Sequence, residues 1–428
     1  MKILFVSGEL TGSGLCQKLI SEGNHVKLFI LRKHWKDCYS GIVEKTTDWK
    51  SELAWVGKDG LIIFDDVVFG EEQDTLRKSG YTVVGGSAGG DRLEIDREYF
   101  QIIAHSLGMN ILPSYNFNDP EDAIDFIVHN PSRWVVKQSS HISSLNFVGT
   151  ASDGSDAVRV LQRYKKRKIS PVHIQRYVQG IEVGVARYFN GTDWVGPIEI
   201  NHEHKKLHEN DRGPLTPEMG TVLWYTDREI RLFSETLGKF KSHLQKIDFR
   251  GDFDINFIVN EEGAWPLEAT PRFGAPSTQV HVALHKTPWV DFLSAVGGKG
   301  VCDLAYHSGY GVVISVAVPP FPYEPDADDM GSLSNPQVEI SIDATVSNED
   351  MDNIHFEEVS KINGAYIWSG KFGLVFHVTA HADTISEAKT LAYTRLSKIK
   401  IPKMYYRTDI GDRVESTDIP QLKIWGWI

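Results

Sequence analysis

The 428-residue chain contains little cysteine and no long hydrophobic run. Its three cysteines, Cys16, Cys38 and Cys302, are too few and too widely spaced for a disulfide framework or a CxxC metal site. No apolar stretch approaches the length of about 18 residues that a membrane span requires. The first residues have the pattern of a strand rather than of a targeting segment. We therefore expect a cytoplasmic protein without membrane association.

Positive charge is scarce relative to negative charge. The chain has 45 Lys and Arg against 57 Asp and Glu, which gives a net charge of −12. Nucleic-acid binding needs clustered lysines and arginines, and the one basic run, 163–168, is interpreted as the solvated end of a helix. We expect no nucleic-acid partner. The length favours two to four domains around a large core.

The first part of the chain alternates apolar strands with helices. Strands are predicted at 3–6, 26–31, 61–64 and 81–84, and helices at 14–22, 71–78 and 94–107. Continuous apolar strands separated by helices are typical of a doubly wound parallel sheet that is covered on both faces. Residues 1–112 are therefore predicted to form an N-terminal α/β domain.

The remainder is predicted to form two further domains. A central domain is expected over 113–305, with a lid subdomain over about 113–180, and a small α+β domain over 306–428. Helices are predicted at 120–129, 155–164, 227–244 and 385–397, and strands at 134–137, 172–178 and 311–318. The overall fold class is mixed α/β and α+β.

The segment from Gly251 to Arg272 carries the strongest chemical signal. Strands over 251–260 and 265–270 are predicted to form a hairpin closed by Glu261-Glu262-Gly263. Such a hairpin places Asp254, Asn256 and Glu268 where they could share one hard cation, with Arg272 nearby. Oxygen ligands beside a guanidinium suit Mg²⁺ on nucleotide phosphates. An exposed acidic hairpin with ordinary surface charges is the alternative interpretation.

Other strand ends and turns carry polar groups. Lys137 ends an apolar strand, where an ammonium can contact phosphate. The strand containing Gln175, Tyr177 and Val178 could read adenine through its main chain, and Glu182 could accept hydrogen bonds from ribose. An ordinary strand and turn is the alternative at each position.

The turn after the first strand has glycines at positions 8, 12 and 14. Gly12 and Gly14 could leave backbone N–H groups free for a phosphate or another small ligand. The spacing does not match G-x-G-x-x-G, which disfavours a bound dinucleotide.

The polar loop over 202–220 contains three histidines, several cations and two glycines. The histidines lack the spacing of a zinc site, which disfavours a metal. Lys205, Lys206 and Arg212 could instead clamp an anion or a carboxylate. Met219 and Gly220 close the loop.

Taken in order, these elements resemble the ATP-grasp fold and, more narrowly, the glycinamide ribonucleotide synthetase family of purine biosynthesis. Four segments carry the resemblance, which runs nearly from end to end: Arg92–Arg97, the loop from His204 to Gly220, Glu268 with Pro271-Arg-Phe-Gly274, and Arg407-Thr-Asp-Ile-Gly411. The resemblance implies a ligase in which ATP phosphorylates a carboxylate and an amine displaces the phosphate. Glycine and phosphoribosylamine are the implied substrates, and a monomer or a homodimer is expected.

The resemblance also implies roles for particular residues. Glu268, with Asn256 or Asp254, would hold Mg²⁺ or, alternatively, Mn²⁺, and Arg272 and Lys206 would be catalytic. ATP would contact Lys137, Gln175, Tyr177, Val178 and Glu182. The substrates would contact Gly12, Gly14, Lys205, Arg212, Met219 and Gly220.

The sequence departs from the family pattern at several places. The lid segment 138–146 contains no glycine, and Gln175 stands where the family has an acid. Thr270 replaces the second metal-ligating Asn, while Ala275 and Ser277 replace an Asp and a Glu. Two alternatives follow: a divergent ligase that couples another amino acid or amine, and an inactive nucleotide-binding scaffold.

Overall fold

Five parallel strands form the first sheet, in the order β3-β2-β1-β4-β5. All four residues of β4 and five of the six residues of β1 are buried, as expected for strands covered by helices on both faces. The computed structural model describes residues 1–138, 147–323 and 337–428. The elements of this region are β1 (Lys2–Ser7), α1 (Leu15–Ser21), β2 (His25–Ile30), η1 (Lys33–Trp35), β3 (Glu44–Thr46), η2 (Trp49–Glu52), α2 (Leu53–Val56), β4 (Leu61–Phe64), α3 (Gly70–Lys78) and β5 (Thr82–Val84).

The helix predicted over 94–107 is wrong in one respect, because two helices occupy this region. They are α4 (Ala88–Ile95) and α5 (Arg97–Ser106). Asp96 lies between them with φ −108° and ψ 88°, outside the helical region, and its carboxylate accepts a hydrogen bond from the Tyr99 N–H at 2.9 Å. An aspartate that caps a new helix ends the preceding one.

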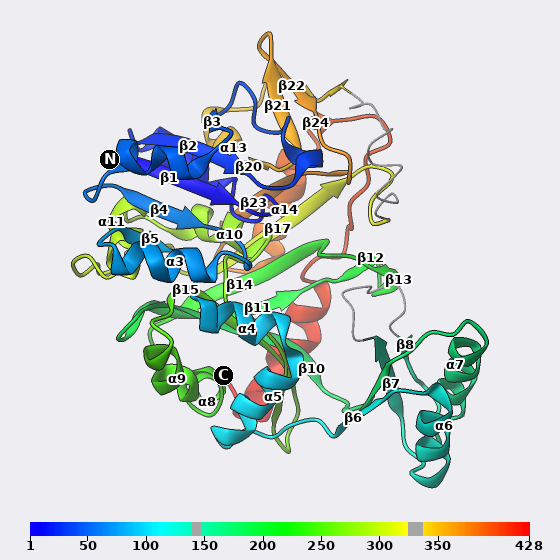
Figure 1. The fold of residues 1–428 in the computed structure, drawn as a ribbon. Helices are drawn as coiled ribbons and strands as arrows, with labels where there is room; N and C mark the ends of the chain where they lie inside the picture. Colours follow the sequence, from blue (N-terminus) through cyan, green and yellow to red (C-terminus); the bar gives the residue numbers. More distant parts are fainter. Residues whose placement is uncertain (139–146, 324–336) are drawn as a thin grey trace.

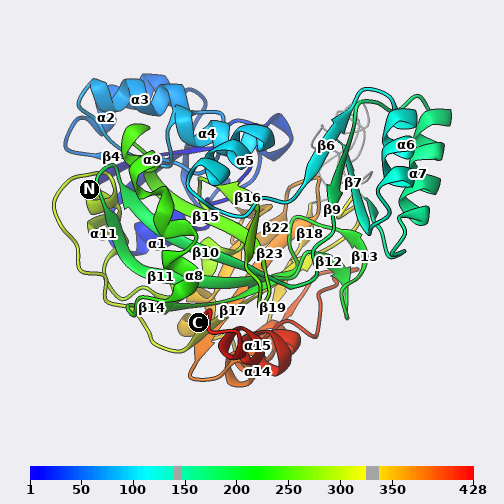
Figure 2. The same cartoon turned by 90° about the horizontal axis from the view of Figure 1, so that it is seen from below.

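A four-stranded antiparallel sheet with two helices forms a separate unit that projects from the rest of the molecule (Figures 1 and 2). Its strand order is β6-β9-β7-β8, and α6 and α7 lie on its outer side. Helix α6 begins at the predicted residue, because the Asp119 side chain caps it and Pro120 follows. The elements are β6 (Ser114–Phe117), α6 (Pro120–His129), β7 (Trp134–Gln138), β8 (Phe147–Val148), α7 (Ser155–Lys166) and β9 (Val172–Arg176).

An eight-stranded sheet forms the centre of the molecule, in the order β16-β15-β10-β11-β14-β17-β23-β20. Its last three strands come from beyond residue 305, so one sheet runs through both the central and the C-terminal regions. The predicted domain boundaries stay predictions. The strands are β10 (Ile181–Asn190), β11 (Trp194–Glu203), β14 (Gly220–Thr226), β15 (Arg250–Val259), β16 (Ala264–Thr270), β17 (Tyr310–Ala317), β20 (Ile354–Phe356) and β23 (Leu374–Ala382).

The predicted hairpin over 251–270 is confirmed as β15 and β16, whereas the continuous helix predicted over 227–244 is wrong. That segment contains α8 (Arg231–Ser234), a 3₁₀ turn (Leu237–Phe240) and α9 (Lys241–Lys246). The break falls at Thr236, whose φ of −126° and ψ of −102° lie outside the helical region. The apolar spacing survives this break, because Leu232, Phe240 and Leu244 all enter the same core.

The remaining elements cover this sheet and extend the C-terminal region. Among the helices of residues 1–138, 147–323 and 337–428, none is both long and apolar enough to cross a membrane. The C-terminus returns to the acidic hairpin, where the buried Trp427 donates through Nε1 to the Asn260 carbonyl at 2.8 Å. The elements are β12 (Lys206–His208), β13 (Arg212–Leu215), α10 (Ser277–Leu284), α11 (Trp289–Val296), β18 (Val338–Glu339), β19 (Ser341–Ile342), α13 (Asn348–Asp352), β21 (Val359–Ile362), β22 (Ala365–Trp368), α14 (Ile385–Leu396), β24 (Ile399–Lys400), a π-helical turn (Val414–Asp418) and α15 (Ile419–Ile424).

Candidate active site

The β15–β16 hairpin aligns the residues predicted to bind a cation. Asn256 lies directly opposite Glu268, and Asp254 lies opposite Thr270. Asn256 is buried, whereas the Glu268 side chain is 41% exposed. In an antiparallel pair, directly opposed side chains lie on the same face of the sheet. The hairpin thus presents one accessible carboxylate with an amide beside it.

Three carboxylates from three strands surround one lysine. The Lys205 Nζ lies 2.8 Å from Glu203 Oε2, 2.9 Å from Glu268 Oε1 and 3.6 Å from Glu182 Oε1. Glu203 ends β11, Glu182 lies near the start of β10, and Glu268 lies in β16. We call these four residues the Lys205 cluster. The Asn256 amide joins it by donating to Glu203 Oε2 at 3.2 Å.

Lys205 and Glu268 each stabilise the charged form of the other. The Lys205 ammonium lowers the pKa of Glu268 to about 2, so Glu268 stays anionic at physiological pH. Burial opposes the charged form of Lys205, but Glu203 and Glu268 together raise its pKa well above the ordinary value. Asp254 differs, because burial and then Glu199 raise its pKa well above the ordinary value. Glu268 is therefore the stronger candidate ligand for a cation.

Two further cations lie beside the Lys205 cluster. Arg97, from α5, has its guanidinium 3.7 Å from Glu268 Oε2. Lys137, from β7, is half-buried, and burial followed by the charge of Arg97 lowers its pKa to about 8. A lysine held in this way gains a strong preference for an anionic partner.

Arg272 follows the hairpin and is held by carboxylates of the N-terminal region. Its Nη2 donates to Glu94 Oε1 at 3.0 Å, and its Nε lies 3.7 Å from Asp66 Oδ1. Its Nη1 donates to the Phe273 carbonyl at 3.0 Å. Glu94 and Arg97, three residues apart, thus contact both ends of the segment from Glu268 to Arg272.

The residues predicted to read the nucleotide lie at the junction of the small sheet with the large one. Gln175 is buried and lies between Ser114 of β6 and Val135 of β7. The Tyr177 N–H donates to the Arg133 carbonyl at 2.9 Å, and the Arg133 guanidinium lies 3.3 Å from the Tyr177 ring centroid. Val178 follows directly. The glycine-free lid segment lies, apart from Gln138, outside the described residues.

The glycine turn after β1 has an internal partner. Asp65 Oδ2 accepts from the Gly12 N–H at 2.9 Å, and Asp65 Oδ1 accepts from the Gly8 N–H at 3.0 Å. A Cβ at Gly12 would lie 3.0 Å from the Cβ of Asp65, whereas one at Gly14 would make ordinary contact with Gln279. In this structure, a carboxylate therefore takes the N–H groups that a phosphate would need. Ligand binding by Gly12 and Gly14 stays a prediction.

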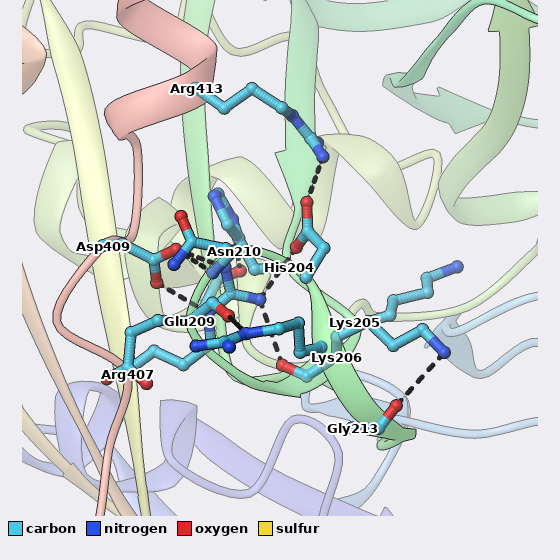
Figure 3. Close-up of polar contacts among 12 residues, drawn as sticks. His204, Lys205, Lys206, Glu209, Asn210, Gly213, Arg407, Asp409 and Arg413 are labelled. Carbon is cyan, nitrogen blue, oxygen red and sulfur yellow. Dashed lines mark hydrogen bonds and ion pairs between the residues drawn. The ribbon is translucent and has the colours of Figure 1, made fainter.

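The polar loop over 204–215 is joined to the C-terminal segment by a set of ion pairs (Figure 3). Arg407 Nε and Nη2 donate to the two oxygens of Asp409, each at 2.8 Å, and its Nη1 contacts Asp211 at 2.9 Å and the Lys206 carbonyl at 3.0 Å. Arg413 also pairs with Asp211. We call Asp211, Arg407, Asp409 and Arg413 the Arg407 clamp.

His204, the first residue of this loop, is held in place by two backbone groups. Its Nδ1 lies 3.2 Å from the Gly220 carbonyl, and its Nε2 accepts a hydrogen bond from the Gly411 N–H at 3.2 Å. These partners require a neutral ring with the proton on Nδ1. Burial, then the charge of Arg407, lowers the pKa of His204 to about 4, which agrees with the neutral form.

The cations of the loop do not converge on one point. Lys205 enters the acid cluster, the Lys206 ammonium contacts the Gly213 carbonyl at 3.3 Å, and the Arg212 Nε contacts the Glu209 carbonyl at 3.2 Å. Met219 is buried in an apolar cluster, and a Cβ at Gly220 would lie 2.5 Å from the Val313 carbonyl. Their roles toward a substrate stay predictions.

Sequence reasoning missed Glu203 as part of this site. Its position gives a usable signal, because Glu203 and Lys205 are two residues apart at a strand end and so lie on the same face. Asp65 was missed as well. No local pattern predicts this contact, because Asp65 is more than fifty residues away in the sequence from the glycines that it binds.

A divalent cation is compatible with this arrangement. In the three described ranges, no group of three or more Asp, Glu, His or Cys side chains forms a metal-holding cage. Mg²⁺ on a nucleotide usually needs only one or two carboxylates together with the phosphates. Glu268 with Asn256 or Glu203 meets that need.

The fold and this site together define an ATP-grasp protein: a small antiparallel sheet projects beside a large one, and an acidic hairpin ends the central region. Residues 96–278 match the ATP-grasp (A) domain of phosphoribosylglycinamide synthetase, and residues 334–413 match its C domain. The chain therefore belongs to the phosphoribosylglycinamide synthetase family.

Curated relatives and solved structures agree with this assignment. The phosphoribosylamine–glycine ligase of Corynebacterium ammoniagenes is 26% identical over 391 residues, covering 87% of this chain and 85% of the relative. The crystal structure of the Thermotoga maritima phosphoribosylamine–glycine ligase has a TM-score of 0.69 at 20% identity, covering 96% of this chain and 100% of that one. A Campylobacter jejuni biotin carboxylase has a TM-score of 0.66 at 9% identity, covering 99% and 98%. At these identities, the solved structures establish the fold alone.

Proposed function

We propose that this chain is an ATP-dependent ligase that joins glycine to 5-phosphoribosylamine, giving glycinamide ribonucleotide, ADP and phosphate. The observation that carries the proposal is the Lys205 cluster with Arg97 and Lys137, which gathers carboxylates and cations from five segments in a chain of this family. Ligation of another amino acid and an inactive scaffold are not favoured, because relatives matching most of the chain are named phosphoribosylamine–glycine ligases.

The proposed reaction has two steps. A carboxylate oxygen of glycine attacks the γ-phosphorus of ATP, ADP leaves, and an acyl phosphate forms. The amine nitrogen of phosphoribosylamine then attacks the acyl carbon, phosphate leaves, and the nitrogen loses a proton as the amide forms. Negative charge accumulates on phosphate oxygens in both steps, so positioned cations would supply most of the stabilisation.

The chain's own residues would hold the nucleotide and its metal ion. Glu268 with Asn256 or Asp254 would bind Mg²⁺ or Mn²⁺, which would neutralise charge on the β- and γ-phosphates. Lys137 would contact phosphate oxygens, because its half-buried ammonium beside Arg97 gains from an anionic partner. Gln175, Tyr177 and Val178 would face adenine, and Glu182 would accept from the ribose hydroxyls.

The remaining assignments concern the substrates. Arg272 and Lys206 would act on the acyl phosphate, which requires Arg272 to share its guanidinium between Glu94 and the ligand. Gly12, Gly14, Lys205, Arg212, Met219 and Gly220 are the proposed substrate contacts. The proposal also includes a cytoplasmic location and a monomer or a homodimer.

The decisive experiment measures ADP release and product mass. The protein is incubated with ATP, Mg²⁺, glycine and freshly generated phosphoribosylamine, and then with each component omitted in turn. We expect ADP release to require both substrates, and the product to have the mass of glycinamide ribonucleotide. Other amino acids serve as controls for specificity. If no amino acid stimulates ADP release in the presence of the amine, the ligase proposal fails.

A further inference from the structure

The ammonium of Lys205 occupies the place that a metal ion would need. It lies within 2.9 Å of both Glu203 and Glu268 and 3.6 Å from Glu182. Of these carboxylates, Glu268 is the strongest candidate ligand for a divalent cation. An ammonium and a divalent cation held by the same carboxylates repel each other at short range, so the two compete for Glu203 and Glu268.

The charges around the Lys205 cluster balance without any metal ion. The carboxylates of Glu182, Glu203 and Glu268 face the ammonium of Lys205, the guanidinium of Arg97 and the charge of Lys137. The buried carboxyls of Glu218 and Asp254 adjoin the cluster, and burial raises the pKa of each well above its ordinary value. Among the six interacting groups, three carboxylates thus face three cations, so a bare divalent cation meets no unpaired carboxylate in the cluster.

The contacts of Lys205 are easy to exchange. An ammonium is a compact point charge on a flexible stem, and this side chain is 27% exposed. Among the residues described, the polar partners of its Nζ are carboxylates alone. No carbonyl or hydroxyl of that part of the chain holds it in place, in contrast to Arg407, which also contacts a backbone carbonyl.

We propose that Lys205 is an exchangeable internal cation: it neutralises Glu203 and Glu268 in the nucleotide-free protein and yields them to a nucleotide-bound divalent cation. This inference rests on the proposed function only for the identity of the nucleotide. The phosphates supply the negative charge that the cluster lacks, so the displaced ammonium gains an anionic partner as the metal ion enters.

The test measures Mn²⁺ binding to the nucleotide-free protein, from the electron paramagnetic resonance signal of free Mn²⁺. We expect weak binding by the unaltered protein and binding on the order of tenfold tighter by Lys205→Met, because a unit charge at about 4 Å repels a dication. The double variant Lys205→Met/Glu203→Gln should lose most of that gain. Lys241→Met, which removes an exposed lysine paired with Asp193 at 2.6 Å, should bind like the unaltered protein.

Two outcomes would overturn the inference. One is Mn²⁺ binding by a folded Lys205→Met protein that is no tighter than that of the unaltered protein, with folding checked by circular dichroism. The other needs no variant: the unaltered protein would bind Mn²⁺ equally tightly with and without ADP. Neither measurement uses glycine or an amine, so a failure of the ligase proposal leaves this result intact, and the reverse also holds.

Discussion

The Lys205 cluster and the Arg407 clamp lie at two parts of the same loop, and each joins cations to carboxylates from distant segments. The Arg407 side chain is 2% exposed and binds Asp409 through two parallel hydrogen bonds. Lys205 is 27% exposed and makes single contacts with three carboxylates. A planar guanidinium in a buried fork geometry is difficult to replace, whereas a point charge is not. Geometry and burial, rather than the number of ion pairs, therefore separate a structural link from a site that can accept a ligand.

The largest effect is expected at the Arg407 clamp. Arg407→Met should lower the free energy of unfolding by about 3–5 kcal/mol, because it leaves Asp409 without its cation and Asp211 with Arg413 alone. Urea unfolding followed by circular dichroism measures the change. Arg32→Met is the matched control, since Arg32 and Glu9 form an exposed pair that should contribute at most about 1 kcal/mol. Equal losses in the two variants would contradict the distinction between the clamp and a surface pair.

At the Lys205 cluster, the loss should appear mainly in activity and to a smaller extent in stability. Glu268→Gln should reduce the rate of ADP release by roughly 10²–10³-fold, because the candidate metal ligand loses its charge. Its free energy of unfolding should fall by less than that of Arg407→Met, since Glu268 is partly exposed and Lys205 keeps Glu203 as a partner. Glu262→Gln, at the exposed turn of the same hairpin, is the control and should leave ADP release unchanged. Unchanged ADP release in Glu268→Gln would remove Glu268 from the site.

The pH dependence of stability should reveal His204. Its pKa is lowered from an ordinary value of 6.5 to about 4, so the unfolded chain binds more protons between these values. The stability contributed by the neutral ring is complete above pH 6.5 and is lost as the pH falls toward 4. We expect His204→Gln to remove about 1–2 kcal/mol of the stability lost between pH 6.5 and 5. Parallel pH profiles for the two proteins would show that His204 is not the neutral link.

The smallest effect concerns Lys137. Because its pKa is lowered to about 8, its ammonium should lose its proton as the pH rises through that value. Affinity for ADP with Mg²⁺ should therefore fall a few-fold between pH 7.5 and 9, and Lys137→Arg should remove that dependence, because Arg stays charged. Isothermal titration calorimetry at several pH values measures both. An unchanged pH dependence in Lys137→Arg would assign the titration to another group.

Much of the fold could be predicted from the sequence because its signals are local. The apolar strand at Leu61–Phe64, the Asp119-Pro120 helix start and the hairpin over 251–270 each follow from neighbouring residues. The breaks at Asp96 and Thr236 could not be located, because apolar spacing continues across a short interruption of a helix.

The candidate site was predictable to a smaller extent. The register that opposes Asn256 and Glu268 follows from the hairpin, but the entry of Lys205 among three carboxylates depends on how the four strands β16, β15, β10 and β11 align in one sheet. Likewise, the partner of the Gly8–Gly14 turn is Asp65, which the parallel sheet brings to the turn from the end of β4. Long-range pairing of this kind leaves no periodic signal in the sequence.

The large sheet also limits where the chain could be divided. Strand β14 pairs with β17 across residues 220–223 and 311–314, on either side of the predicted boundary at 305. A chain cut at that boundary would expose a row of unpaired N–H and C=O groups along β14, which is a template for edge-to-edge association. The two halves should therefore aggregate when expressed apart and become soluble when produced together. A soluble protein would then require more of the chain than the predicted central domain.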